Sequence, residues 1–140
     1  MRRFLLLLGF CAILTPVEAS LDDAIASALQ AMDPYVKQGF IIRDDQWGGD
    51  LGLREQKAIP HTLFKGNDYW FCLGSDVENA RLAIHLYDSK GKLTESDSWQ
   101  KGRFAAVRIL PPATGTYYII VEVVSAPKER TNWAMVYGYK

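Results

Sequence analysis

The sequence predicts an all-β domain, an antiparallel β-sandwich or barrel, with one N-terminal α-helix packed on it. Short β-rich runs recur from residue 58 to the end of the chain, and turns containing Gly, Asn, Asp or Pro separate them. Residues 20–33 have helical periodicity, and no second strong helix is expected. The whole chain has 140 residues, which is the size of one ordinary domain.

The first element along the chain is a predicted signal peptide, residues 1–19. Two arginines precede an apolar run over residues 4–14, and residues 17–19 place small side chains where a signal peptidase cleaves. The run is shorter than the roughly 20 residues that a membrane span needs, so we expect cleavage after Ala19 rather than an anchor. Lipidation of Cys11 is not expected, because a bulky residue precedes it inside the run. These features predict a periplasmic or secreted bacterial protein with no membrane span.

Charge and cysteine content exclude several classes of protein. The whole chain has 16 basic and 16 acidic residues, and loss of Arg2, Arg3 and Glu18 with the signal peptide leaves 14 and 15. Such a balance argues against the basic face that binds nucleic acid or an anionic membrane. Cys72 is then the one remaining cysteine, which excludes a disulfide framework. About 120 residues can bury a core without one.

The predicted helix begins at the proposed cleavage point. Ser20 and Asp23 resemble a capping box, and Pro34 is expected to end the helix at Asp33. Such a short helix is marginal in water, so its apolar stripe is expected to pack across an outer sheet face. The alternative is a detachable arm that binds a partner. The stripe consists of Leu21, Ile25, Ala28, Leu29 and Met32.

An acidic, glycine-rich loop is expected after the helix, around residues 44–52, so that helix and loop fill residues 20–56 and the sandwich fills 57–140. Calcium needs several oxygen ligands on a flexible loop, and Asp44, Asp45 and Asp50 are the best candidates in this chain. Their spacing does not match an EF-hand, and a solvated acidic turn is the alternative. No other cofactor is expected.

The predicted strands divide their side chains between two faces by alternation. The runs are 58–64, 69–73, 81–87, 104–110, 117–124 and 133–139. One face is expected to form the sandwich interior, with Tyr69, Phe71, Ile84, Leu86, Ile119 and Val121. The opposite faces carry Trp70, Cys72, Ala83 and Tyr87, an apolar surface that the helix is expected to cover in part.

The stretch from Leu63 to Tyr139 resembles the bacterial pre-peptidase C-terminal domain family. The matching pieces are Leu63-Phe64-Lys65-Gly66-Asn67-Asp68-Tyr69-Trp70-Phe71, Leu82-Ala83-Ile84-His85-Leu86-Tyr87-Asp88-Ser89-Lys90-Gly91 and Pro111-Pro112-Ala113-Thr114-Gly115-Thr116-Tyr117-Tyr118-Ile119-Ile120-Val121. The resemblance implies a secreted, jelly-roll-like β-sandwich that serves as a binding, targeting or folding module of exported enzymes. Some collagen-binding relatives hold calcium near their N-terminal edge. This chain departs from the usual setting, since it has no enzyme attached and carries its own helix.

Catalytic residues are not evident in the sequence. His61 and His85 each stand alone on an apolar strand without metal-ligand spacing, and both are expected to be satisfied sheet residues. Cys72 has large apolar neighbours and is expected to be a buried, unreactive thiol. Trp47 and Trp99 fall in predicted loops and are candidate ligand-binding residues, since exposed aromatics hold sugars and partner proteins. The alternative is that each plugs an open end of the sandwich.

These observations predict an exported, non-enzymatic binding or accessory module. Its partner would be an unidentified exported protein or a polysaccharide. Two alternatives stay open: a structural subunit of an exported complex, and a small hydrolase that uses His61 or His85 with nearby acids.

Overall fold

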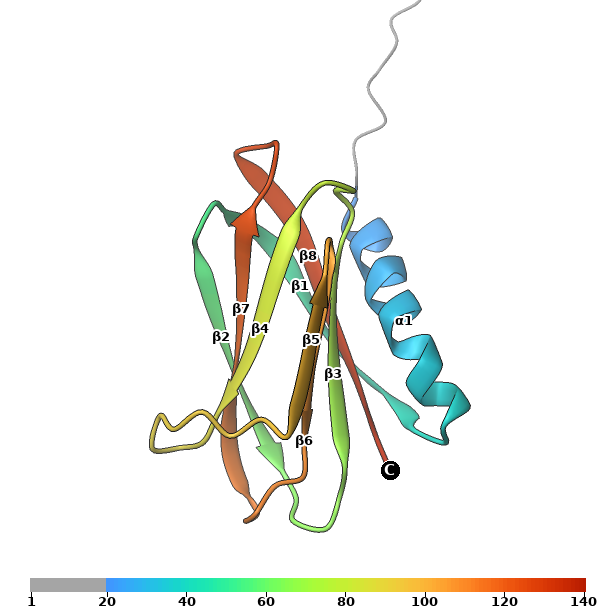
Figure 1. Cartoon of the computed structure of the whole chain (residues 1–140), viewed down its shortest axis with the longest axis vertical. Coiled ribbons are helices and arrows are strands. Elements are labelled where there is room, and N and C mark those ends of the chain that lie inside the picture. Colours follow the sequence, from blue (N-terminus) through green and yellow to red (C-terminus); the bar gives the residue numbers. More distant parts are fainter. Residues whose placement is uncertain (1–19) are drawn as a thin grey trace, which may run out of the picture.

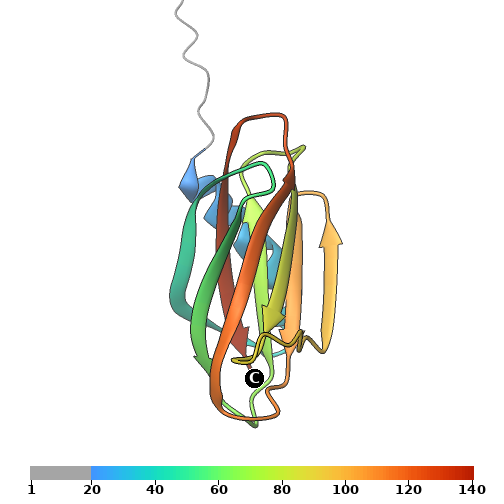
Figure 2. The ribbon, with the colours of Figure 1, turned by 90° about the vertical axis from the view of Figure 1, so that its left-hand side faces the viewer.

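Two antiparallel β-sheets pack face to face, and one helix lies on the outside of the larger sheet (Figure 1). The computed structural model describes residues 20–140. The elements are α1 (Leu21–Lys37), β1 (Ile41–Gly52), β2 (Gln56–Leu63), β3 (Tyr69–Ser75), β4 (Arg81–Tyr87), β5 (Asp97–Lys101), β6 (Phe104–Ile109), β7 (Gly115–Ser125) and β8 (Arg130–Tyr139). The larger sheet has the order β1-β8-β3-β6-β5, with β5 at its margin (Figure 2), and the smaller one β2-β7-β4. The predicted all-β sandwich with one N-terminal helix is confirmed.

The six predicted strands are all present, but the expectation of a loop around residues 44–52 is wrong. This segment belongs to β1, which pairs with β8, so the sandwich begins well before residue 57. One of its glycines serves a close approach between elements. A Cβ on Gly48 would lie 2.6 Å from Cδ1 of Leu21 and 3.1 Å from the Trp133 carbonyl oxygen. The second missed strand is β5, which holds Trp99.

The core lies between the two sheets, where the alternation placed it. All six residues expected in the interior are buried, together with Leu73, Leu82, Val107 and Met135. Every residue of β3 is buried, because one face of this strand meets the smaller sheet and the other meets α1. Full burial on both faces makes β3 the centre of the domain.

The helix begins as predicted and ends later than predicted. The amide of Asp23 donates to Ser20 Oγ and the amide of Ser20 donates to Asp23 Oδ2, both at 3.2 Å, which forms the capping box. Pro34 lies inside the helix, which continues to Lys37. The last turn is held by Tyr35, whose ring stacks on Trp70 at 4.0 Å between centroids. These tertiary contacts offset the hydrogen bond that a proline cannot donate.

The helix packs on the outer face of the larger sheet, as expected, but its buried stripe matches the expected one only in part. Ala28 and Met32 are buried, and Ile25 packs against the same cluster. Leu21 and Leu29 are 42% and 40% exposed. The buried helix residues are Ala24, Ser27, Ala28, Ala31 and Met32. Small helix residues pack against the sheet because the strand has a glycine at the contact, which lets the helix backbone come close. A Cβ on Gly74 would lie 2.4 Å from the Ala28 amide nitrogen.

The expected outer apolar surface is divided between the two sheets. Trp70 and Cys72 lie beneath the helix in one buried cluster. Ala83 and Tyr87 belong to β4 of the smaller sheet, so the expectation of one continuous surface is wrong. Within residues 20–140, no helix has the length and apolarity that crossing a membrane requires.

Candidate functional site

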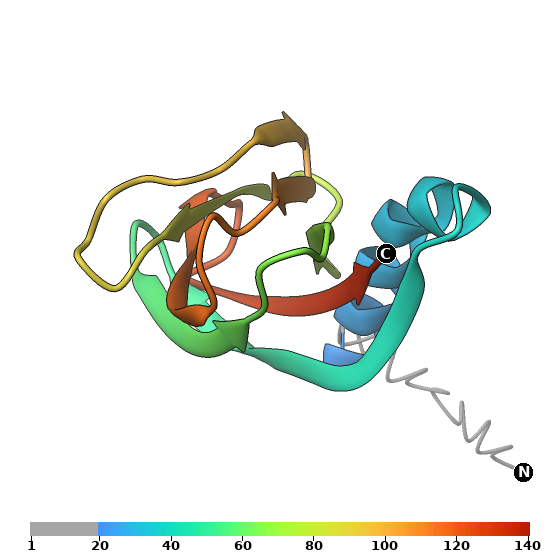
Figure 3. The same cartoon turned by 90° about the horizontal axis from the view of Figure 1, so that it is seen from below.

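The two sheets part along one side of the sandwich, and the space between them opens as a polar cleft. The edge strands there are β1 of the larger sheet and β2 of the smaller one, and they diverge away from the turn that joins them (Figure 3). The cleft measures about 410 Å³, within the range of small-molecule sites. We call it the seam cleft; it is lined by Arg43, Asp45, His61, Thr62, Phe64, Asn67, Tyr69, Tyr137 and Tyr139.

The pairing of β1 with β8 is interrupted by a β-bulge, and residues of this bulge line the cleft. Ile42 pairs with Gly138 and Gln46 pairs with Val136, so residues 43–45 of β1 stand opposite Tyr137 alone. Bulges of this kind bend the strand and re-aim side chains, and they are enriched beside functional sites. Here the bulge supplies two of the charged residues that line the cleft.

An aromatic pair forms the inner part of the cleft. His61 Nε2 lies 3.0 Å from the Tyr137 hydroxyl, and the two rings meet edge to face with 5.0 Å between centroids. Tyr137 is 4% exposed. Trp47 lies beside both rings, 5.3 Å from His61 and 5.7 Å from Tyr137. Trp47 is partly buried and packs against the core at this point, and ligand binding by Trp47 stays a prediction.

The protonation of this pair follows from its surroundings. Burial lowers the pKa of His61 against an opposing effect of Asp45, and burial raises the pKa of Tyr137. Both rings are therefore uncharged at neutral pH. The positive charge of Arg43 acts on both pKa values, because it favours the ionised form of Tyr137 and the neutral form of His61. Either the Tyr137 hydroxyl or His61 Nε2 donates the hydrogen bond between them, according to the tautomer of the imidazole.

The lower rim of the cleft is fixed by a second tyrosine. The Tyr69 hydroxyl accepts from the amide of Phe64 at 3.0 Å and from Nδ2 of Asn67 at 3.1 Å. Asp68 then binds Arg108 through both carboxylate oxygens, at 2.9 and 2.6 Å. The turn between β2 and β3 is thereby held at both ends. Phe64 at its start remains 54% exposed.

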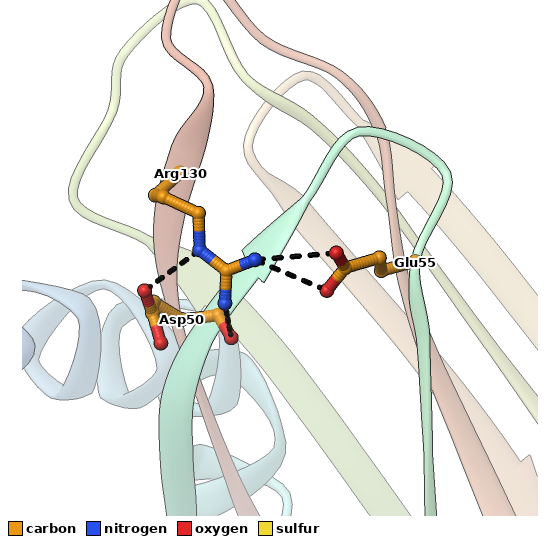
Figure 4. A network of polar contacts seen from close by, with 3 residues as sticks. All are labelled: Asp50, Glu55 and Arg130. Atoms are coloured by element: carbon orange, nitrogen blue, oxygen red, sulfur yellow. Dashed lines mark hydrogen bonds and ion pairs between the residues drawn. The ribbon is translucent and has the colours of Figure 1, made fainter.

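The three acidic residues predicted as calcium ligands all lie on β1, and two of them have different partners. Asp45 lines the seam cleft, whereas Asp50 accepts from Nε of Arg130 at 2.9 Å (Figure 4). Arg130 also binds Glu55 at 3.2 Å, and it lowers the pKa of Asp50. Among residues 20–140 no three His, Cys, Asp or Glu side chains converge as a metal site would require. Calcium binding by Asp44, Asp45 and Asp50 stays a prediction.

The second predicted ligand residue, Trp99, lies at the far edge of the larger sheet. Its indole N–H donates to the Tyr35 hydroxyl at 2.6 Å, so it contacts the end of the helix. It also borders an open groove of about 490 Å³ between the helix and β5, with Lys101 and Arg103 nearby. Trp47 and Trp99 thus do not share a site.

The remaining nucleophile and base candidates lie apart from the cleft. Cys72 is fully buried, and burial raises the pKa of its thiol. Its sulfur faces Met32 Sδ at 3.5 Å beneath the helix. His85 lies on β4, where its Nδ1 is 3.3 Å from Glu95. The structure therefore joins neither His85 nor Cys72 to His61.

Comparison with known proteins gives a distant similarity to a solved structure. No family model matches the chain, and no curated protein matches it. Among solved structures, the chain is similar to Aeromonas hydrophila PliG, described as a periplasmic lysozyme inhibitor of g-type lysozyme, with 14% identity and a TM-score of 0.49. The match covers 69% of this chain and 85% of that one. The resemblance to the pre-peptidase C-terminal domain family stays a prediction.

Most cleft residues could not be found from the sequence, because they come from four separate strands and one turn. The sequence pointed to Asp45 as a possible calcium ligand, and it predicted His61 only as a satisfied residue of a sheet. One signal was available. Tyr137 and Tyr139 occupy the inward alternation of the last strand, and a polar-tipped aromatic in that position usually finds a hydrogen-bond partner.

Proposed function

We propose that this protein is an exported, non-enzymatic binding module that holds its ligand in the seam cleft. The observation that carries the proposal is the His61–Tyr137 pair, hydrogen-bonded inside an open cleft beneath a bulged strand. Preformed concave sites with a few convergent polar groups are the usual places where proteins hold small ligands. The bulge in β1 places Arg43 and Asp45 in the lining of the same cleft.

The protonation states favour binding over catalysis. Covalent catalysis is favoured by a nucleophile whose pKa is lowered. Burial raises the pKa of Tyr137 and of Cys72, the opposite change. His61 stays neutral and serves as a hydrogen-bonding partner. The groups of the cleft are thus suited to bind a ligand without reacting with it.

Export is proposed from the predicted signal peptide, residues 1–19, which lies outside the described residues. The capping box at Ser20 supports a mature chain that starts there, since the helix begins directly after the proposed cleavage point. The pre-peptidase C-terminal type is proposed as well, from the order and spacing of its turns in the sequence.

The test is ligand capture with a matched pair of variants. Labelled mature protein, residues 20–140, is crosslinked in the exported fraction of the producing cells, and the bound material is identified. Tyr137→Phe removes the hydroxyl inside the cleft, and Tyr118→Phe removes one from the outer face of the smaller sheet. We expect capture to fall about tenfold or more in the first variant, ~1.4 kcal/mol, and to stay unchanged in the second.

Equal capture by both variants would move the binding surface away from the cleft and favour the structural-subunit alternative. A hydrolase screen with and without a chelator, in wild type and in His61→Gln, tests the non-enzymatic part. Turnover that disappears in His61→Gln would contradict it. Inhibition of a g-type lysozyme is included as one further readout of binding.

A further inference from the structure

We propose that the ligand of the seam cleft is an uncharged saccharide. The inference rests on the proposed function of the cleft and names its ligand class. It follows from three properties of the lining: the absence of a net charge, the density of paired donors and acceptors, and the position of the aromatic rings.

The charges of the cleft cancel. Arg43 and Asp45 both come from the bulge, two residues apart, and His61 is neutral because burial lowers its pKa. Arg43 also lies over the Tyr139 ring, with 5.3 Å from its guanidinium carbon to the ring centre. A charged ligand of either sign would meet one like charge in this lining, which therefore favours an uncharged ligand.

Donors and acceptors lie side by side along the cleft. The Asp45 carboxylate accepts, a ring nitrogen of His61 donates or accepts according to its tautomer, and the Asn67 amide and Thr62 hydroxyl do both. Each hydroxyl of a sugar is likewise a donor and an acceptor. Few other uncharged ligands carry such groups on neighbouring atoms, whereas a saccharide carries them around its whole ring.

The aromatic side chains add a surface for the apolar faces of a sugar ring. Phe64 is 54% exposed at the rim, and the backbone amide that anchors it is bound by Tyr69. Tyr139 is half-buried on the opposite wall and is held by Arg43. A ring that is held in advance, as Tyr139 is by Arg43, loses little entropy when a ligand stacks on it.

A protein ligand fits this arrangement less well. Protein interfaces have an apolar, desolvated centre surrounded by a polar rim. In the seam cleft the order is reversed, since the Tyr137 hydroxyl and His61 lie deepest and Phe64 lies at the edge. The inner groups would lose their water to an apolar anchor without gaining a hydrogen bond, which is costly for buried polar groups.

The experiment is titration calorimetry of the mature protein with glucose, mannose, galactose and N-acetylglucosamine oligomers, and with uronic-acid oligomers as charged probes. We expect one neutral series to bind. Phe64→Ala and Tyr137→Phe should each weaken binding about tenfold. The matched changes at an exposed site, Tyr118→Ala and Tyr118→Phe, should alter it less than twofold. Near-UV circular dichroism confirms that each variant is folded.

Preferential binding of uronic-acid oligomers would overturn the inference, and so would equal effects at Tyr118 and in the cleft. Failure of every saccharide to bind would overturn it as well. The capture experiment then separates the two proposals. If no saccharide binds but Tyr137→Phe lowers capture of a protein, the cleft remains the binding site and the proposal of a saccharide ligand is wrong. If Tyr137→Phe leaves capture unchanged, the proposal that the cleft binds the ligand is wrong.

Discussion

Replacing Gly74 by alanine tests how closely the helix approaches the larger sheet. An added Cβ would lie 2.4 Å from the Ala28 amide nitrogen, 2.6 Å from the Ser27 carbonyl carbon and 2.8 Å from Ser27 Cβ. The first two of these atoms belong to the helix backbone, so no side-chain rotation relieves the contact. The strand, buried on both faces, cannot move away either. The helix itself must retreat.

The size of the effect follows from that retreat. Ordinary contact begins at 3.4 Å, so the helix has to move by about 1 Å. A gap of 0.5–1 Å loses roughly a quarter to a half of the dispersion energy across an interface. The loss falls on the buried cluster that holds Met32, Trp70 and Cys72. We expect Gly74→Ala to lower the free energy of unfolding by about 2–3 kcal/mol, the upper part of the range for overpacked cores.

Urea denaturation followed by tryptophan fluorescence measures the difference, and Gly115→Ala is the control. Gly115 also lies on a strand, but nothing stands within 4 Å of a Cβ built there. That variant should be neutral or gain up to about 1 kcal/mol from reduced freedom of the unfolded chain. If the two variants differ by less than about 0.5 kcal/mol, the close approach of helix and sheet is incorrect.

Four further outcomes are expected. Leu29→Ala should change stability by less than about 0.5 kcal/mol because the side chain is 40% exposed, whereas the fully buried Met32→Ala should cost about 2–5 kcal/mol in the same melts. Cys72 should react with a thiol reagent only after denaturation, because it is buried and the pKa of its thiol is raised; stoichiometric labelling of the native protein would contradict this. The pKa of His61 is lowered in the folded state, so as the pH falls the unfolded chain takes up the proton first. The contribution of His61 to the free energy of unfolding should therefore be present above about pH 6.5 and decrease as the pH falls below it. His61→Gln should remove this pH dependence from the urea midpoints. Micromolar calcium should leave the melting temperature unchanged, because the Asp50 carboxylate is already paired; a large upward shift would restore the calcium site.

The seam cleft shows how far sequence patterns reach toward a binding site. Alternation predicted that His61 lies on a strand, but not that Tyr137, distant in the sequence, supplies its partner. The sequence pointed to Asp44, Asp45 and Asp50 as a group, but the prediction that they lie in a loop is wrong, because they lie on β1. Asp45 reached the cleft through a bulge in a paired strand, and bulges depend on the register between two strands rather than on either sequence alone.

Local chemistry by itself determined the start of the helix, the six main strands and their inward faces, and the turns between them. Ser20 and Asp23 lie within one turn of each other, and Asp88 accepts from the amides of Lys90 and Lys92 in the turn after β4. The capping box and this turn involve only residues that are close in the sequence, so the local sequence is enough to predict them. Hydrophobic alternation is equally local, and it placed the interior correctly.

The tertiary structure decided the strand β1, the extension of the helix past Pro34, and the helix face that packs on the sheet. In each case a contact with a distant part of the chain is the reason. Pairing with β8 makes β1 a strand, and stacking of Tyr35 on Trp70 holds the last turn of the helix. At the helix–sheet contact Gly74 carries no side chain, so the helix approaches at very short range there through Ala28. Hydrophobicity ranks Leu29 above Ala28, but shape against a distant partner decides which of them is buried. That shape exists only once the strands are paired.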